Sequence, residues 1–195
     1  MKLHYVARLT VLALCLASAS CGSVREGTGT SFLVISRLEA ASGAKPSEFA
    51  GLLQSDVLTV VDKIPSTFSD NGRVTLRLGL KDPISPAQPT QNQAITIDRY
   101  HVEFKRSDGR NSPGVDVPYG FDGAFTVTVT DQSLATFELV RHIAKDEAPL
   151  RALVNNPTVI STIAEITFFG RDLTGHEVSV VGHITVDFGD FGDPK

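Results

Sequence analysis

The chain has 195 residues, a formal net charge of −4 at pH 7, and 42% hydrophobic against 21% charged residues. This balance excludes a disordered chain, which lacks the apolar mass for a core. The mild acidity disfavours a nucleic-acid-binding protein, which normally presents a basic stripe, and we expect no nucleic-acid partner. At this length the default is one folded domain.

Residues 1–20 have the features of an export signal. Lys2 and Arg8 supply positive charge, an apolar run spans residues 9–17, and small residues fill positions 17–20. The run is too short to persist as a membrane-spanning helix. We therefore expect export from a bacterial cytoplasm and removal of this signal peptide. Because Lys2 and Arg8 leave and no acid does, the net charge falls from −4 to −6.

Two cleavage sites fit the end of this signal. The stretch Ala17-Ser18-Ala19 matches the small-x-small pattern of ordinary signal peptidase, which would cut before Ser20. The stretch Ser18-Ala19-Ser20-Cys21 resembles the lipobox of bacterial lipoproteins, with Ser18 where an aliphatic residue is usual. That resemblance implies acylation of Cys21, and it leaves residues 21–30 as a lipidated, polar tether.

The lipobox resemblance also implies a location. The residue directly after the cysteine is Gly22. An Asp at this position would resemble the inner-membrane retention signal of enteric lipoproteins, and this chain lacks it. We therefore expect a lipid anchor in the outer membrane, with the protein facing the periplasm. Cys15 leaves with the signal, so no disulfide can form within the mature chain.

The remainder of the chain, residues 31–195, alternates apolar and polar residues with period two, as half-buried strands do. The alternation is clearest over residues 73–81, 124–130 and 177–188. Further strands are expected at residues 31–38, 56–61, 136–140 and 161–169.

Residues 95–106 alternate too, but the phase changes. Ile95 and Ile97 are apolar at odd positions, whereas Tyr100 and Val102 are apolar at even ones. A β-bulge near Asp98-Arg99, or a strand that changes sheets there, would keep both sets in the core.

Turn residues separate these strands. Asp70-Asn71-Gly72 predicts a turn before the strand at 73–81, and Asp172 to Gly175 predicts a hairpin. One short helix is expected at residues 146–154, with Asp146 as its N-cap and Pro149 in its first turn. About eight strands and one helix predict an all-β fold, a single antiparallel β-sandwich domain over residues 31–195.

The end of the chain sharpens this fold class. The hairpin Phe169-Gly170-Arg171-Asp172-x-x-Gly175, followed by a long alternating strand, resembles the last two strands of bacterial immunoglobulin-like domains. The resemblance covers about the last quarter of the chain. It implies an immunoglobulin-like sandwich without the Trp and Cys pair of antibody domains, since the chain has no Trp.

Two loops carry the candidate binding residues. Residues 82–92 hold three prolines and are expected to cross between sheets at the surface. Residues 111–123 place Tyr119 and Phe121 among Pro, Gly and Asp. These aromatics either cap one end of the core or form a binding loop, and we favour the cap because aromatic rings bury large areas.

Few residues suggest catalysis or metal binding. Asp116 and Asp122 in the loop, with Asp187, Asp190 and Asp193 near the end, are weak candidates for calcium. His101, His142, His176 and His183 lack the spacing of a zinc site. Glu103, Glu165 and Glu177 could supply a carboxylate pair, but no catalytic motif singles them out, and we expect neither enzyme activity nor a cofactor.

These features predict a membrane-anchored envelope lipoprotein whose β-sandwich binds or scaffolds a neighbouring envelope protein, for instance through an unpaired edge strand. A calcium- or glycan-binding surface module is the alternative. An envelope hydrolase ranks third.

Overall fold

A computed structural model of the protein describes residues 30–81 and 91–192. The predicted signal peptide, Cys21, most of the tether, most of the 82–92 loop and Asp193 lie outside these residues. The strands are β1 (Ser31–Ala41), β2 (Leu52–Asp56), β3 (Thr59–Val61), β4 (Ile64–Ser66), β5 (Asp70–Leu80), β6 (Ile95–Lys105), β7 (Phe121–Val129), β8 (Gln132–Val140), β9 (Ile160–Asp172) and β10 (Glu177–Gly189). The helical turns are η1 (Gln91–Gln93), α2 (His142–Lys145) and η2 (Leu150–Leu153).

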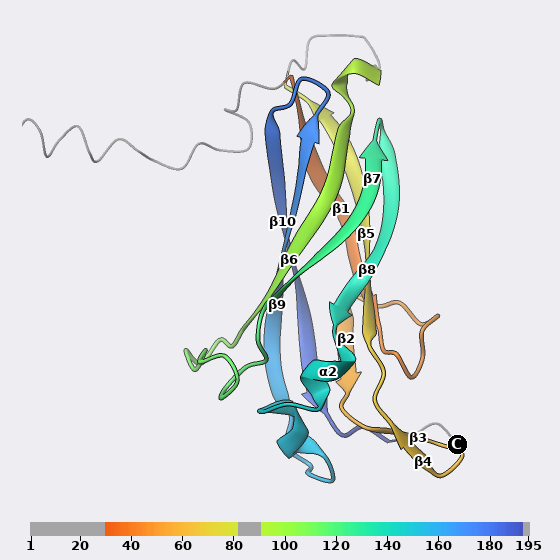
Figure 1. Ribbon diagram of the computed structural model, residues 1–195, viewed down its shortest axis with the longest axis vertical. Coiled ribbons are helices and arrows are strands. Elements are labelled where there is room, and N and C mark those ends of the chain that lie inside the picture. Colours follow the sequence, from red (N-terminus) through yellow and green to blue (C-terminus); the bar gives the residue numbers. More distant parts are fainter. Residues whose placement is uncertain (1–29, 82–90, 193–195) are drawn as a thin grey trace, which may run out of the picture.

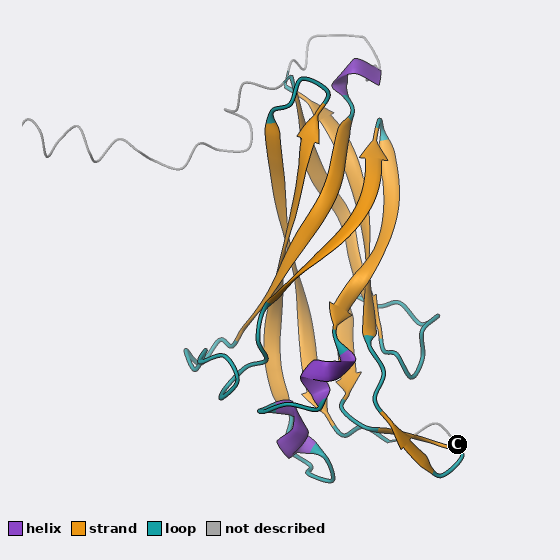
Figure 2. Cartoon of the chain, in the orientation of Figure 1, coloured by secondary structure: helices purple, strands orange, loops and turns teal. Residues whose placement is uncertain are grey.

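The predicted all-β class is confirmed (Figure 2). Three strands form one sheet in the order β1-β5-β8, five form a second in the order β2-β10-β9-β6-β7, and β3 pairs with β4 as a separate hairpin. The five-stranded sheet curls into half a barrel. Every pair is antiparallel except β2 with β10, which is parallel. The sequence did not predict this parallel pair, because the residue pattern of a strand as short as β2 does not indicate the direction of its partner.

The molecule is elongated, and its two ends are distinct (Figure 1). β1 begins at the end where Ser31 pairs with Leu80, which we call the proximal end. β1 finishes at the opposite, distal end, where Ala41 pairs with Asn71. The β3–β4 hairpin projects from the distal end, and the β9–β10 turn lies at the proximal end (Figure 1).

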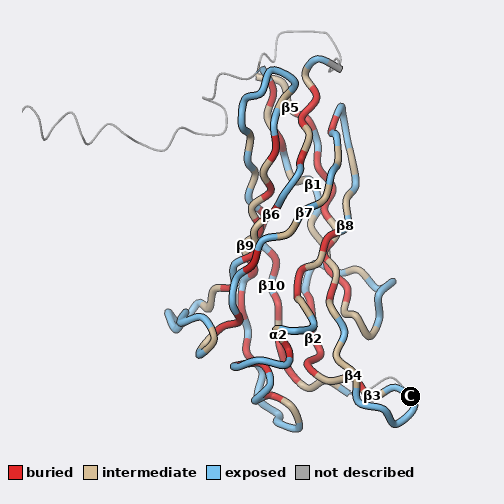
Figure 3. Tube along the Cα trace, viewed as in Figure 1, coloured by how far each residue is buried: buried red, intermediate tan, exposed pale blue. Residues whose placement is uncertain are grey.

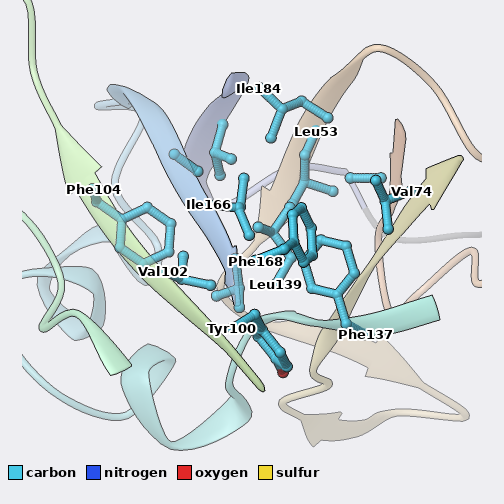
Figure 4. Close-up of a cluster of buried hydrophobic side chains, with 14 of the residues drawn as sticks. Leu53, Val74, Tyr100, Val102, Phe104, Phe137, Leu139, Ile166, Phe168 and Ile184 are labelled. Atoms are coloured by element: carbon cyan, nitrogen blue, oxygen red, sulfur yellow. The ribbon is translucent and has the colours of Figure 1, made fainter. Parts of the chain in front are cut away.

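The core lies between the two sheets and is rich in aromatic rings (Figures 3 and 4). The ring of Phe137, on β8, lies 5.1 Å from that of Tyr100 on β6 and 5.2 Å from that of Phe168 on β9. The Tyr100 hydroxyl also donates to the backbone carbonyl of Glu138, at 3.0 Å. The two sheets therefore face each other through edge-to-face ring contacts, which add to the burial of apolar area.

The phase change in β6 is a β-bulge, the first of the two predicted alternatives, and the strand stays in one sheet. The register of β6 shifts between Ile97 and Arg99 against both β7 and β9. Asp98 is exposed, while Ile97 and Tyr100 are both buried. The extra residue thus keeps apolar side chains in the core on both sides of the bulge.

The bulge brings the β6 backbone close to β9 at Gly170. A Cβ atom at Gly170 would lie closer than 3 Å to the carbonyl group of Thr96 and to the Cα of Ile97. These are backbone atoms in the middle of a sheet, so they cannot rotate away as a side chain could. Glycine at this position is therefore a steric requirement of the bulge.

The local predictions around residues 56–72 need correction. The expected strand at 56–61 is divided between β2, which ends at Asp56, and β3, which begins at Thr59; the chain leaves the sheet after Val57, whose amide still donates to the Gly189 carbonyl of β10. The predicted turn at Asp70-Asn71-Gly72 is wrong, since these residues begin β5. Asp70 is fully buried, and the Phe137 ring lies against Gly72, which explains why turn-forming residue types occur inside a strand.

The predicted helix at 146–154 is also wrong. Its place is taken by α2, which ends before Asp146, and by the 3-10 turn η2, which begins after Pro149. Asp146 is therefore a C-cap and not an N-cap. The two turns bury Lys145 from α2 and Leu150 and Leu153 from η2.

The predicted hairpin at Asp172 to Gly175 is confirmed. Asp172 Oδ1 accepts hydrogen bonds from the amides of Thr174 and His176, both at 2.9 Å, and from the Thr174 hydroxyl at 2.7 Å. Burial opposes ionisation of Asp172, but these hydrogen bonds outweigh it and lower its pKa from 3.8 to about 2. Gly175 completes the turn with a φ of 88°.

We expect Gly170→Ala to destabilise the fold by about 1–3 kcal/mol, because the new methyl group must displace the β6 backbone at the bulge. Gly51→Ala is the matched control: nothing lies within 4 Å of a Cβ at Gly51. Urea unfolding of both variants measures the difference. Equal stability of the two variants would show that the strands move apart at little cost.

Asp172 predicts a specific acid dependence. Its folded-state pKa lies below the unfolded value, so its contribution to stability is complete above about pH 4 and is lost as the pH falls towards 2. Asp172→Asn should be less stable than the wild type by about 1 kcal/mol near pH 6. That gap should close between pH 4 and 2 in denaturant titrations. A gap independent of pH would contradict an ionised Asp172 in the turn.

Candidate functional site

The two aromatics of the 111–123 loop have different environments. Phe121 is the first residue of β7 and is buried, with its ring 6.3 Å from that of Tyr100 and the Arg141 guanidinium 4.4 Å from its centre. Tyr119 is 56% exposed, and its ring lies against Gly114, whose φ is 75°. The structure thus places Phe121 in the core and leaves Tyr119 at the surface.

The aspartates considered for calcium are held in separate local contacts. Each of the four described aspartates accepts a hydrogen bond from a different part of the chain. Asp116 accepts from the Ser112 amide, Asp122 from His101 Nδ1, Asp187 from the Ser161 hydroxyl and Asp190 from the Asn155 amide. Over residues 30–81 and 91–192, no three His, Cys, Asp or Glu residues gather in a way that could hold a metal ion. The structure therefore does not gather these four aspartates into one site.

The candidate acids occupy the outer face of the five-stranded sheet. Glu103 on β6 lies directly across from Glu165 on β9, and Lys105 bridges both carboxylates at 3.1 Å. The hydrogen bond from Lys105 lowers the pKa of Glu165. A general acid needs a raised pKa, so this arrangement opposes that role for Glu165. Glu177 lies nearer the proximal end, paired with Arg171.

A buried ion pair that the sequence did not reveal connects α2 with β5. Lys145 and Asp70 side chains are 1% and 0% exposed, and Lys145 Nζ lies 2.9 Å from Asp70 Oδ1. Lys145 also donates to the backbone carbonyl of Asp56 at 2.8 Å. Asp70 accepts from the Ser55 hydroxyl at 2.6 Å and from the Gly43 amide at 2.8 Å. We call this arrangement the Lys145–Asp70 clamp.

The clamp has the chemistry of a structural site. Burial raises the pKa of Asp70, while the charge of Lys145 and the bonds from Ser55 and Gly43 act in the opposite direction. Both carboxylate oxygens already accept hydrogen bonds, and neither side chain reaches solvent. A substrate would have to displace these bonds to react here, so the site is suited to holding strands together.

The β3–β4 hairpin presents exposed apolar side chains at the distal end. Ile64 is 64% and Val61 43% exposed, on either side of a two-residue turn. Asp62 and Lys63 form this turn with φ values of 52° and 68°, as a type I′ hairpin requires. Asp-Lys lacks the Asn-Gly signal of such turns, which is why the sequence did not predict the hairpin.

Other exposed apolar residues lie at the same end. Phe68 leads from the hairpin into β5, and Ile143 lies on α2; both are exposed. The hydroxyl of Ser69 accepts a hydrogen bond from the His142 amide at 3.1 Å and so joins these two segments. The distal end therefore combines an apolar hairpin with an exposed isoleucine on the helical turn α2.

None of the helices in the described part of the chain is long and apolar enough to cross a membrane. Models of known protein families do not match the chain, and no curated protein is significantly similar to it in sequence.

We expect Lys145→Met to destabilise the fold by about 3–5 kcal/mol, because it leaves the Asp70 carboxylate buried without its counter-ion. Lys105→Met is the matched control, since Lys105 also contacts two acceptors but is 44% exposed. It should cost no more than about 1 kcal/mol. Chemical unfolding of both variants at neutral pH compares them. Similar losses would mean that the clamp does not support the fold.

Proposed function

We propose that the protein is a bacterial envelope lipoprotein, acylated at Cys21 after removal of residues 1–20. In this proposal residues 31–195 form one immunoglobulin-like β-sandwich that binds or scaffolds another envelope protein without catalysis. The anchor would hold it in the outer membrane, facing the periplasm. The support for the anchor comes from the signal and lipobox-like residues of the sequence.

The facing sheets support the sandwich. Tyr100, Phe137 and Phe168 connect the five-stranded sheet to the three-stranded one, as inner faces of a sandwich do. The chain passes from β7 at the edge of one sheet to β8 at the edge of the other through the short turn at Thr130 and Asp131. Such a change of sheet is typical of this architecture, while the parallel β2 and the curl of the larger sheet are departures from its simplest form.

The observation that carries the binding role is the position of the apolar hairpin relative to the start of β1. β1 follows the tether directly at the proximal end, whereas β3 and β4 lie at the distal end. Eleven residues of extended strand span about 35 Å. A module anchored through Cys21 would thus hold Val61 and Ile64 away from its anchor point, where a partner protein could cover them.

The hairpin is a better candidate for this contact than the edge of β8. On that edge the Glu138 carbonyl already accepts the Tyr100 hydroxyl. The Arg141 side chain, directly after β8, lies over the ring of Phe121 at the start of β7. An added strand would have to displace both contacts, whereas the hairpin side chains are already exposed.

A glycan-binding surface module is the alternative, favoured by the exposed ring of Tyr119 over Gly114. A single ring offers a small stacking platform. Calcium has less support, because the loop and C-terminal aspartates that the structure describes are engaged separately. An unchanged melting temperature with excess calcium or with a glycan panel would remove this alternative, since a ligand of the folded state must stabilise it.

One expression experiment tests the proposal in two steps. The first step is the intact mass of the full-length product, together with labelling by an alkynyl fatty acid. We expect an acylated chain that begins at Cys21, and loss of both label and membrane association in Cys21→Ser. A chain that begins at Ser20 without acyl groups would overturn the anchor.

The second step places a photo-crosslinking amino acid at Ile64 in the acylated protein. We expect one discrete crosslinked band, identified by mass spectrometry as an envelope protein. The control position is Val181, which is 47% exposed on the outer face of the five-stranded sheet. The same band from both positions, or none from Ile64, would contradict a binding role for the hairpin.

A further inference from the structure

The outer face of the three-stranded sheet carries an apolar patch at its proximal half. Val34 on β1 is 43% and Leu134 on β8 is 60% exposed. Arg77 on β5 lies between them: it pairs directly with Val34 in the register and is diagonal to Leu134. The ring of Phe32 lies flat against Gly79 beside them. We call these four residues the proximal patch.

The strand segments that form the proximal patch carry a single charge, that of Arg77. The strand segments that form it, residues 31–36, 74–80 and 132–136, contain no Asp or Glu. Arg77 is exposed and makes no ion pair within the part of the chain that the structure describes. The nearest acid in the sequence is Asp131, which lies in the turn before β8.

Three other cationic residues on the sheet faces have acidic partners. Further along the same face, Arg73 and Arg37 share Glu39, at 2.9 Å and 3.5 Å. On the outer face of the five-stranded sheet, Lys105 lies between two glutamates. Arg77 thus differs from Arg73, Arg37 and Lys105 in having exposed aliphatic neighbours and no acidic partner among the described residues.

The segment that precedes the described residues joins the fold beside the proximal patch. Residues 22–29 separate Cys21 from Thr30, and β1 begins one residue later with Phe32 and Val34 close behind. Eight residues can reach about 28 Å when fully extended. A surface that holds Cys21 is therefore within reach of the proximal patch at all times.

We propose that the proximal patch rests on the phospholipid surface in which Cys21 is anchored. Val34 and Leu134 contact the interfacial region of the bilayer, and the Arg77 guanidinium binds a headgroup phosphate. This inference rests on the acylation of Cys21 in the proposed function. The outer face of the smaller sheet then lies against the membrane surface.

Weak contacts are enough for this arrangement. A short tether raises the effective concentration of the surface around the patch to about millimolar, so the patch needs little affinity of its own. Aliphatic side chains and an arginine are the groups that interfacial segments use on anionic membranes. The outer face of the five-stranded sheet and the β3–β4 hairpin stay free for a partner protein.

The test uses the full-length chain, processed and acylated, in vesicles of phosphatidylethanolamine and phosphatidylglycerol. Cys21 is blocked by its lipid, so one environment-sensitive dye can be attached through Leu134→Cys. Val181→Cys on the opposite sheet is the control. We expect lipids carrying a headgroup-level spin label to quench the dye at position 134 about twofold or more compared with position 181.

Two charge-reversal substitutions test the contact between Arg77 and a headgroup phosphate. In the Leu134→Cys background, Arg77→Glu should reduce the quenching in anionic vesicles. Lys63→Glu makes the same charge change at the exposed distal hairpin and should leave the quenching unchanged. Equal effects of the two substitutions would overturn the phosphate contact.

The remaining outcomes distinguish a failure of this inference from a failure of the proposed function. Equal quenching at positions 134 and 181, or none at either, on a chain with the acyl mass would overturn the proximal patch alone. A blue-shifted dye at position 134 that lipid probes do not quench would mean that a protein or a second copy covers the patch, which also overturns it. Absence of the acyl mass would overturn both proposals.

Discussion

Lys145 and Asp70 form an ion pair that is closed to solvent, and four separate parts of the chain converge on it. The amide of Gly43 comes from the β1–β2 connection, Ser55 and the Asp56 carbonyl from β2, Asp70 from β5, and Lys145 from α2. Removing two charges from water costs several kcal/mol each, so such a pair is tolerated only where its hydrogen bonds are made. This requirement positions α2 and β2 against β5.

The distal end depends on that clamp. β2 is a five-residue edge strand and α2 has one turn, so neither has enough apolar surface to hold its position alone. The β3–β4 hairpin lies between Asp56 and Asp70, both of which take part in the clamp. The proposed partner-binding element is thus fastened at both of its ends by buried polar contacts.

The proximal end is organised by sheet geometry instead. The bulge at Asp98 curves the larger sheet, and Gly170 lets the β6 backbone approach closely enough for that curve. Apolar residues on both sides of the bulge stay inward, and the outer face of the larger sheet carries charged residues such as Lys105 together with the exposed Ile163 and Val181. The smaller sheet retains exposed aliphatics near the start of β1. The two proposals thus use different regions: a distal hairpin for a protein, and a proximal face for lipid.

The sequence by itself determined most of the long strands. Period-two alternation located β5, β7, β9 and β10, and one change of phase located the bulge in β6, because both patterns come from the pleat and operate over a few neighbouring residues. The export signal and the lipobox-like residues around Cys21 are likewise local patterns. They remain predictions, since these residues lie outside the described structure.

Only the tertiary structure decided what the distal end looks like. Asp70-Asn71-Gly72 has the local preferences of a turn, yet it forms a strand because Lys145, 75 residues away, supplies the counter-ion for Asp70. In place of one helix around Asp146 the chain forms two helical turns, and Lys145 at the end of the first is held by the same contact with Asp70. Contacts between residues far apart in the chain overrode local preference at these sites. No pattern of neighbouring residues records such contacts, so the clamp and the hairpin it holds became visible only in the folded chain.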